Sequence, residues 1–453
     1  MKLDLIVAID EKFGIGKDGT IPWNCKEDLK LFKNLTENSV LIMGRKTVEK
    51  LPVLQNRKIF CLTRKPPVEQ AGSGNNIMYF ETATQALDFY QDHYNHLKLF
   101  VAGGERIYTL FLTMFSHMIE RIHLSRIKGV YDTDTVLYSL DISKYRIQSE
   151  TDYSTFKYQV LIPSYQDEEK AYLSLLKKVL IQGEVRDGRN GETKSVFCEK
   201  LTFNLENGFP LLTTKKMFLR GIFEELLFFL KGQTDTKILE SKGVNIWKGN
   251  TNRSFLDSLN MTNRKEGEMG PMYGFQWRFF GKDDNNNNTG FDQLNYVVET
   301  LKIDPFSRRI LMTTYNPSQA FQGVLFPCHS IVNQFYVSNN KELEMTCYNR
   351  SQDLFLGTPF NIASSALLLI IIAHLTKLKP TKLHLILGDC HIYKSHYDSV
   401  AKQITRDIYV FPKLILKPEV KLESLKDIDN LSWNSFSLEN YLHCEAIKAD
   451  MVA

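Results

Sequence analysis

Apolar and polar positions alternate along roughly the first third of the chain in a regular rhythm. Short runs rich in β-branched and aromatic residues predict strands, and stretches with apolar residues at helical spacing lie between them. This rhythm is typical of an α/β domain with a mainly parallel sheet, in which helices cross between strands. The predicted strands are Leu5–Ile9, Val40–Met43, Ile59–Thr63, Leu97–Val101, Ile122–Ser125 and Ser154–Ile162, and the predicted helices include Glu27–Leu35 and Thr84–Tyr90.

The pattern changes at residues 164–168, where a polar segment follows the last predicted strand. Beyond it the predicted helices are longer, and the strands are less regularly interleaved with them, which favours an α+β domain. These helices are Glu169–Leu180, Leu219–Lys231 and Ile362–Lys377. A chain of 453 residues exceeds what one hydrophobic core usually serves. We therefore expect two domains, at 1–163 and 169–453, joined by a short linker at 164–168.

The composition is that of a soluble globular protein, and it narrows the classes of function. A formal net charge of +4 is small for this length, which gives weak support for an anionic substrate and none for a dedicated nucleic-acid binder. The seven scattered cysteines contain no Cys-x-x-Cys pair, which argues against a disulfide framework or a structural zinc site and for the cytoplasm. The most apolar run, Ala366–Ala373, is too short to span a bilayer and predicts a buried core helix. We expect neither a metal nor a membrane partner.

Candidate chemistry is densest between residues 326 and 393. Cys328 lies between Pro327 and His329, and most lone cysteines are simply small buried hydrophobic residues. The same region, however, also supplies cationic, hydroxyl, amide, imidazole and phenol groups, at Arg350, Ser351, Asn361, His391 and Tyr393. A thiol with such neighbours suits a covalent catalyst that acts on a phosphorylated, hydrogen-bonding heterocycle. The amide of Asn361 carries a donor and an acceptor, which match the ring N–H and carbonyl of uracil.

Further groups upstream suit the same chemistry. Glu225 lies in an apolar helix, which should raise its pKa and let it relay protons, whereas its neighbour Glu224 fits a solvent-facing position better. Trp247 offers an aromatic wall for a flat ring. Arg308 and Arg309 could bind a phosphate dianion, although a basic turn would look the same.

The first domain contains stretches suited to a flat heterocycle and a phosphorylated cofactor. Asp28 begins an amphipathic helix, where its carboxylate either accepts hydrogen bonds from an amino-heterocycle or simply complements the helix dipole. The segments 44–47 and 103–108 each follow a predicted strand, so their amides and cations can meet phosphate groups. Arg64, after a third strand, suits a further phosphate and could equally be an ordinary surface arginine.

In this order, these stretches resemble dihydrofolate reductase over residues 1–163. The resemblance implies that Asp28 anchors and helps to protonate the pteridine. It implies that Thr135, in preference to Thr133, supports the Asp28 carboxylate. It implies a mobile loop from Gly14 to Pro22 and a cis Gly103–Gly104 bond. The chain departs from the family at Val48, where an aromatic residue is usual. The implied folate pocket contains Val7, Ala8, Asp28, Leu29, Phe32, Leu54 and Thr135, with Arg57 on the glutamate carboxylate. The implied NADPH site contains Ala8, Ile15, Gly16, Gly44, Arg45, Lys46, Thr47, Leu62, Thr63, Arg64, Gly103, Gly104, Glu105, Arg106, Ile107 and Tyr108.

From about residue 168 onward the chain resembles thymidylate synthase, on motifs that recur in order to the C-terminus. They include the segments 224–230, 244–247, 270–278, 307–310, 326–330 and 356–361. The resemblance implies that Cys328 attacks carbon 6 of the uracil in dUMP. Carbon 5 then takes a one-carbon unit, and afterwards a hydride, from 5,10-methylenetetrahydrofolate, which gives dTMP and dihydrofolate.

The same resemblance implies roles for the residues around the thiol. Tyr273 would lie beside it, Arg350 and Ser351 would bind the dUMP phosphate, Asn361 the uracil, and His391 and Tyr393 the ribose. Arg308 and Arg309 would reach the phosphate bound by the other subunit of a homodimer. Folate would be contacted by Trp247, Asp353, Leu356, Gly357 and Phe360, although Asp353 could instead cap a helix. The C-terminal residues 446–453 would close over the folate.

One motif of the second domain departs from its family. The loop that usually supplies a phosphate-binding arginine reads Asp187-Gly188-Arg189-Asn190-Gly191-Glu192-Thr193 here, with the arginine displaced by one position. Arg189 is the candidate ligand, with Arg186 behind it. The two resemblances together predict a bifunctional enzyme in which the reductase regenerates the folate that the synthase oxidises. The alternatives are a pyrimidine nucleotide hydroxymethylase fused to a folate reductase, and a folate- or RNA-binding regulatory protein with a decayed site.

Overall fold

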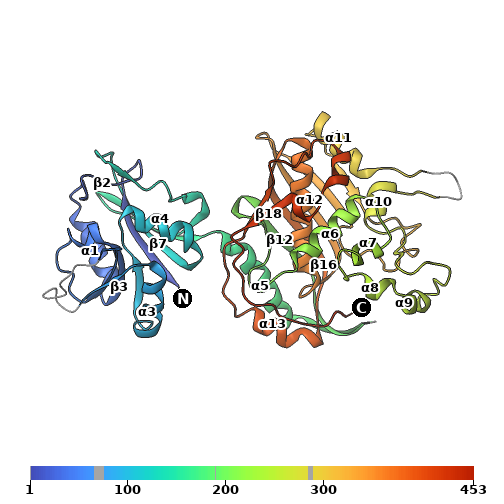
Figure 1. The fold of residues 1–453 in the computed structure, drawn as a ribbon, viewed down its shortest axis with the longest axis horizontal. Coiled ribbons are helices and arrows are strands. Elements are labelled where there is room, and N and C mark those ends of the chain that lie inside the picture. The colour runs from blue at the N-terminus through green and yellow to red at the C-terminus, as the bar shows by residue number, and fades with distance from the viewer. Residues whose placement is uncertain (1, 66–75, 189, 284–288, 453) are drawn as a thin grey trace. The chain divides into compact units, whose positions relative to one another are not determined.

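The computed structural model describes residues 2–65, 76–188, 190–283 and 289–452 (Figure 1). The chain divides into two compact units, Met1–Tyr165 and Gln166–Ala453. Helix α5 (Tyr165–Gln182) begins four residues before its predicted start at Glu169, so it takes up most of the segment expected to be a linker. Each unit has its own sheet and its own hydrophobic core.

The first unit is built on a mixed, mainly parallel sheet, as predicted. Among the residues that the structure describes, eight strands lie in the order β5-β4-β3-β6-β1-β7-β10-β9. Neighbours from β5 to β7 are parallel, and β10 and β9 add antiparallel pairs at one edge. The strands are β1 (Leu3–Ile9), β3 (Ser39–Gly44), β4 (Arg57–Leu62), β5 (Ile77–Phe80), β6 (Lys98–Val101), β7 (Ile119–Ile127), β9 (Tyr145–Asp152) and β10 (Phe156–Pro163).

Helices cross between these strands, and their starts define where ligands can be held. The helices are α1 (Lys26–Thr36), the short α2 (Arg45–Val48), α3 (Ala83–His93) and α4 (Glu105–Met114). Strands β1 and β3 are almost continuously buried because helices cover both faces of a parallel sheet. A second ladder pairs the short strands β2 (Gly14–Gly16) and β8 (Thr135–Val136), which the sequence pattern did not predict.

The second unit is an α+β domain around a six-stranded sheet, counted over the described residues, in the order β11-β12-β16-β15-β14-β13. Only the β15–β16 pair is parallel within this described sheet. Its strands are β11 (Glu184–Gly188), β12 (Gly191–Asn204), β13 (Leu311–Thr313), β14 (Val332–Val337), β15 (Glu342–Asp353) and β16 (Lys379–Tyr393). A separate ladder joins β17 (Lys413–Leu416) and β18 (Phe436–Glu439).

The apolar helix α12 (Gly357–Thr376) packs against β15 and β16 and contacts α6 (Leu219–Leu230) and α11 (Gln293–Ile303). It is long and apolar enough to cross a membrane, but 72% of its apolar window is buried inside the domain. The prediction of a buried core helix is therefore confirmed. The remaining helices of this unit are α7 (Lys237–Glu240), α8 (Lys248–Thr251), α9 (Arg253–Ser258), α10 (Gly274–Phe279) and α13 (Tyr397–Gln403).

The C-terminal segment is held on the second unit by hydrogen bonds of its backbone to a backbone carbonyl and to a histidine side chain. The Cys444 amide donates to the Thr213 carbonyl at 2.8 Å, and the Asp450 carbonyl bonds a ring nitrogen of His396 at 2.9 Å. Thr213 is itself fixed because the buried carboxylate of Glu169 accepts hydrogen bonds from its amide and hydroxyl. Glu169, near the start of α5, and Cys444, near the end of the chain, therefore both bond to Thr213.

Candidate active sites

The Cys328 thiol lies in a tight polar cluster in the second unit. Its Sγ is 3.4 Å from the Tyr273 hydroxyl, which also accepts a hydrogen bond from the Cys328 amide. His329 stacks on the ring of Tyr273 with centroids 4.3 Å apart, and burial lowers the pKa of His329 to about 4. This histidine is therefore a neutral packing group at physiological pH. Burial raises the pKa of the Cys328 thiol, whereas the Tyr273 hydroxyl and the Arg350 charge lower it.

Arg350 is fixed beside the thiol by its own side chain and backbone. Its Nε and Nη2 donate to the carbonyls of Pro327 and Phe326, at 2.9 and 3.3 Å. The guanidinium also lies over the Phe326 ring, 5.0 Å from its centroid. The amides of Arg350 and Ser351 both donate to the Cys328 carbonyl. Arg350 and Ser351 are thus held next to Cys328 in the structure.

Trp247 links the carboxylate of Glu225 to the residues around Cys328. The indole N–H donates to Glu225 at 2.8 Å, and the Trp247 ring lies 5.9 Å from that of Tyr273. Burial raises the pKa of Glu225 to about 7, and the bond from Trp247 partly opposes that rise. The interpretation of Glu224 as solvent-facing is wrong, because its side chain is buried and pairs with Lys242 at 2.6 Å.

Polar groups at the start of α12 extend the cluster. Asn361 lies in the first turns of this helix, and its Nδ2 donates to Gln352 at 3.1 Å. The carboxylate of Asp353 accepts from the amides of Phe355 and Leu356, so it caps the turn that leads into the helix. Leu356, Gly357 and Phe360 are half-buried around this turn.

His391 and Tyr393 lie on β16 next to this turn, since the register pairs His391 with Asp353. The imidazole of His391 bonds the carboxylate of Asp389 at 3.0 Å and meets the ring of Tyr393 edge-on. Arg186 also reaches Asp389, at 3.5 Å. Arg189, the residue chosen from the sequence for the phosphate loop, lies outside the described residues.

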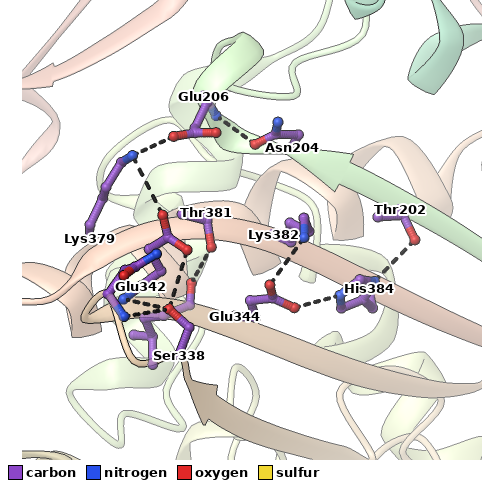
Figure 2. A network of polar contacts seen from close by, with 12 residues as sticks. Thr202, Asn204, Glu206, Ser338, Glu342, Glu344, Lys379, Thr381, Lys382 and His384 are labelled. Atoms are coloured by element: carbon purple, nitrogen blue, oxygen red, sulfur yellow. Dashed lines mark hydrogen bonds and ion pairs between the residues drawn. The ribbon is translucent and has the colours of Figure 1, made fainter. Parts of the chain in front are cut away.

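The paired arginines Arg308 and Arg309 are exposed. Arg308 lines a pocket on the open face of the second sheet with Tyr336 and Glu344. On the same face a polar network joins residues of β12, β15 and β16 (Figure 2). In it, His384 joins the Thr202 hydroxyl to the Glu344 carboxylate, at 3.1 Å on each side.

Asp28 is a half-buried carboxylate in the first turn of α1. Burial raises its pKa, and a hydrogen bond from the Ser125 hydroxyl partly opposes the rise. The expectation that Thr135 supports this carboxylate is wrong, because its hydroxyl donates to Asp134 at 2.8 Å. Ser125 lies on β7 directly beside Ala8 of β1, a proximity that only the sheet register reveals. A small hydroxyl residue within the predicted strand Ile122–Ser125 is the signal that could have identified it.

The residues of the expected folate pocket differ in exposure. Val7 is buried, Ala8, Phe32 and Leu54 are half-buried, and Leu29 is 54% exposed. Arg57 is buried, and its guanidinium donates to the Thr36 hydroxyl and to the carbonyls of Gln55 and Lys33. Among the described residues these bonds use three of its five N–H groups.

The strand ends β3 and β6 meet where a phosphorylated cofactor was expected. The Gly103–Gly104 bond is cis, as the resemblance implied, and the Gly44 amide donates to the Gly103 carbonyl at 2.8 Å. Gly103 has φ of +111°, and a Cβ there would lie 3.2 Å from the hydroxyl of Tyr108, which donates to the Ile6 carbonyl. Only glycine therefore lets the backbone and the phenol approach this closely.

Cations and hydroxyl groups surround these glycines, which suits a dinucleotide with several phosphates. Arg45 pairs with Glu49 at 2.6 Å, and Glu105 accepts from Thr109. Of the residues expected to bind NADPH, the exposed ones are Arg45, Lys46, Arg64 and Arg106. The half-buried ones are Ile15, Thr47, Thr63, Gly104, Glu105 and Ile107, and Gly16 and Leu62 are buried. Within the described residues, no cluster of three or more potential metal ligands is present.

Comparison with known proteins agrees with both halves of this geometry. A family model for dihydrofolate reductase matches residues 2–166, and one for thymidylate synthase matches residues 170–453. The chain is 37% identical to the bifunctional dihydrofolate reductase-thymidylate synthase of Paramecium tetraurelia, over 99% of this chain and 98% of the relative. The chain belongs to the bifunctional dihydrofolate reductase–thymidylate synthase family. The enzyme of the same name from Leishmania major is 34% identical over 99% of this chain and 94% of that protein, and enzyme 2 of Arabidopsis thaliana is 37% identical over 96% and 86%.

The protein is accordingly a bifunctional enzyme with thymidylate synthase and dihydrofolate reductase activities. Both families use folates, and the reductase family uses NADPH. These matches support neither the hydroxymethylase nor the regulatory folate- or RNA-binding protein considered as alternatives.

Proposed function

We propose that Cys328 is the nucleophile of dUMP methylation. The observation that carries this proposal is the convergence of the Tyr273 hydroxyl, the Arg350 side chain and the Ser351 amide on one cysteine. Arg350 and Tyr273 lower the thiol pKa against the effect of burial, so they favour the thiolate. The thiolate bonds to carbon 6 of the uracil, which makes carbon 5 nucleophilic toward the methylene group of 5,10-methylenetetrahydrofolate. Loss of the carbon-5 proton and hydride transfer from the same folate then release Cys328, dTMP and dihydrofolate.

The residues around the thiol hold the nucleotide in this proposal. Arg350 and Ser351 bind its phosphate, because a guanidinium fork and a hydroxyl are strong phosphate donors. Asn361 binds the uracil, and His391 and Tyr393 bind the ribose. Arg189 remains a prediction for the phosphate loop, with Arg186 as its described neighbour.

Glu225 moves protons beside the bound base and folate. Its pKa of about 7 lets both protonation states exist at physiological pH, as proton relay requires. Trp247 holds this carboxylate by its indole N–H and offers its ring as a wall for the folate. The other folate contacts we propose are Asp353, Leu356, Gly357 and Phe360.

In the first unit, Asp28 binds the pteridine and assists its protonation, since burial raises the pKa of this carboxyl group. The half-buried apolar groups near it form the folate pocket, and Arg57 binds the glutamate carboxylate. NADPH, when bound, supplies the hydride that reduces dihydrofolate. The chain binds its phosphates through Arg45, Lys46, Arg64 and Arg106, while the close backbone approach at Gly103 and Gly104 positions its nicotinamide half.

The enzyme acts as a homodimer through the open face of the second sheet. The register places Leu311, Gln334 and Thr346 side by side on this face, with Tyr336 on the next row, 66% exposed. Such a half-apolar face, together with the pocket that Arg308 lines, suits a self-complementary contact. Arg308 and Arg309 would then serve the partner's phosphate site. Sedimentation equilibrium of the full chain tests this, and a monomer at micromolar concentration would contradict it.

We also propose a cytoplasmic location, because all seven cysteines are free. The decisive experiment for the activities supplies dUMP, 5,10-methylenetetrahydrofolate and NADPH together. We expect dTMP to form, NADPH to be consumed, and peptide mass spectrometry of a trapped intermediate to locate the nucleotide on Cys328. A trapped adduct on any other residue would overturn the proposed nucleophile.

A further inference from the structure

A buried amide on β15 has no role in the proposed chemistry. Gln352 is only 2% exposed, and it follows Ser351 directly in the chain. Its Oε1 accepts hydrogen bonds from Asn361 Nδ2 at 3.1 Å and from the Thr358 hydroxyl at 3.0 Å. Its Nε2 donates to the Ser351 carbonyl at 3.0 Å. The side chain therefore links the backbone beside the thiol to the amide proposed to bind the pyrimidine.

The direction of these bonds is fixed at one end. The Ser351 carbonyl can only accept, so the amino group of Gln352 must face it. The Gln352 oxygen then faces Asn361, and the amino group of Asn361 must face that oxygen. Thr358 does not oppose this direction, because its hydroxyl can donate to either the Gln352 oxygen or the Asp353 carbonyl.

This direction decides what Asn361 can offer to a ligand. One N–H of its amide is used by Gln352, and its Oδ1 has no hydrogen-bond partner among the described residues. An acceptor and one donor remain, in a fixed arrangement. Uracil complements them, since its ring N–H donates to the oxygen and its carbonyl accepts from the N–H. Cytosine has the opposite polarity on that edge, with an acceptor ring nitrogen and a donor amino group.

We propose that Gln352 is a specificity-determining residue, which locks the Asn361 amide in the orientation that accepts a uracil nucleotide and rejects a cytosine nucleotide. The inference rests on the proposed binding of the base by Asn361. Rotating the Asn361 amide to suit cytosine would place its oxygen against the Gln352 oxygen. Rotating Gln352 as well would place that oxygen against the Ser351 carbonyl. Either arrangement leaves buried polar groups unpaired, which is strongly unfavourable.

Nucleotide binding to the full-length enzyme tests the lock without relying on catalysis. Isothermal titration calorimetry would give the dissociation constants of dUMP and dCMP for the natural enzyme and for Gln352→Met, which keeps the length of the side chain but none of its hydrogen bonds. We expect the preference for dUMP over dCMP to fall by about tenfold or more in Gln352→Met. A residue that only supports the fold would weaken both nucleotides equally and leave their ratio unchanged, which would overturn the inference.

Two further variants distinguish the proposed effect of Gln352 on the orientation of the Asn361 amide from a general effect on the stability of the fold. Gln352→Glu should retain the preference, because a buried neutral carboxyl can donate to the Ser351 carbonyl and accept from Asn361. Thr358→Val removes a neighbouring hydrogen bond but leaves the polarity of Gln352 unchanged, so it should also retain the preference. Loss of preference in both would overturn the lock. Failure of the natural enzyme to bind dUMP would instead overturn the proposed function from which the inference starts.

Discussion

The two units hold their reactive groups in different ways. In the reductase unit, the proposed ligand contacts follow strand ends in the order of the chain, and the Ser125 hydroxyl partly opposes the rise in the pKa of Asp28. In the synthase unit, Cys328 is joined to Tyr273, 55 positions away, and its carbonyl anchors the backbone of Arg350 and Ser351. A parallel sheet brings successive strand ends to one edge, so local motifs suffice there. The synthase site depends on contacts between segments that are distant in the chain. A single substitution there should therefore displace more of the site's residues than one in the reductase site.

The largest expected effect is on the thiol. Cys328→Ser should reduce dTMP formation by at least about 10³-fold, because a hydroxyl of high pKa replaces the nucleophile. Dihydrofolate reduction by the same preparation should be unchanged, since that activity belongs to the other unit. Assaying both activities on one sample checks this, and Cys198→Ser, which changes an exposed cysteine, is the matched control. If Cys328→Ser kept full dTMP formation, Cys328 would not be the nucleophile, and the comparison between the two units would no longer hold.

The reciprocal change lies in the reductase unit. Asp28→Asn should slow dihydrofolate reduction by about 10²-fold or more at neutral pH, since the amide cannot deliver a proton. Formation of dTMP, measured without NADPH, should stay near that of the natural enzyme. A parallel loss of both activities would mean that the two sites are not independent.

A smaller effect distinguishes Ser125 from Thr135. Ser125→Ala removes a hydrogen bond that favours the ionised Asp28, so the pKa of this carboxyl group should rise further. The pH dependence of dihydrofolate reduction should move to higher pH by the same amount. Thr135→Ala is the control, because the Thr135 hydroxyl bonds Asp134. Equal shifts in both variants would refute the assignment of Ser125.

The smallest predicted effect concerns Trp247 and Glu225. The indole bond favours the ionised carboxylate, so Trp247→Phe should raise the pKa of Glu225 above its value of about 7. The corresponding limb in the pH dependence of dTMP formation should therefore move to higher pH. A shift to lower pH, or none, would show that this limb does not report Glu225.

Sequence reasoning succeeded wherever a property is carried by residues close in the chain. The strands near Leu5, Val40 and Ile59 followed from apolar runs, and the buried helix near Ala366 from its unbroken apolar stretch. It failed where two segments had to be placed side by side. Glu224 was misjudged because its partner Lys242 lies on another element, and strands β5 and β9 have weak local patterns.

The sequence by itself determined the two families and the order of the two units, and it pointed to Cys328 and Asp28 as the proposed reactive groups, because residue types and short spacings encode them. Only the tertiary structure shows which side chains lie beside Cys328 and Asp28. Ser125 reaches Asp28 through the register of β1 and β7, and Gln352 orients Asn361 through a bond between a strand and the following helix. Hydrogen bonds have direction and a range of about 3 Å. The spacing of residues along the chain gives neither the direction nor the length of a hydrogen bond. The arrangement of donors and acceptors in the proposed pyrimidine site therefore becomes visible only in the folded structure.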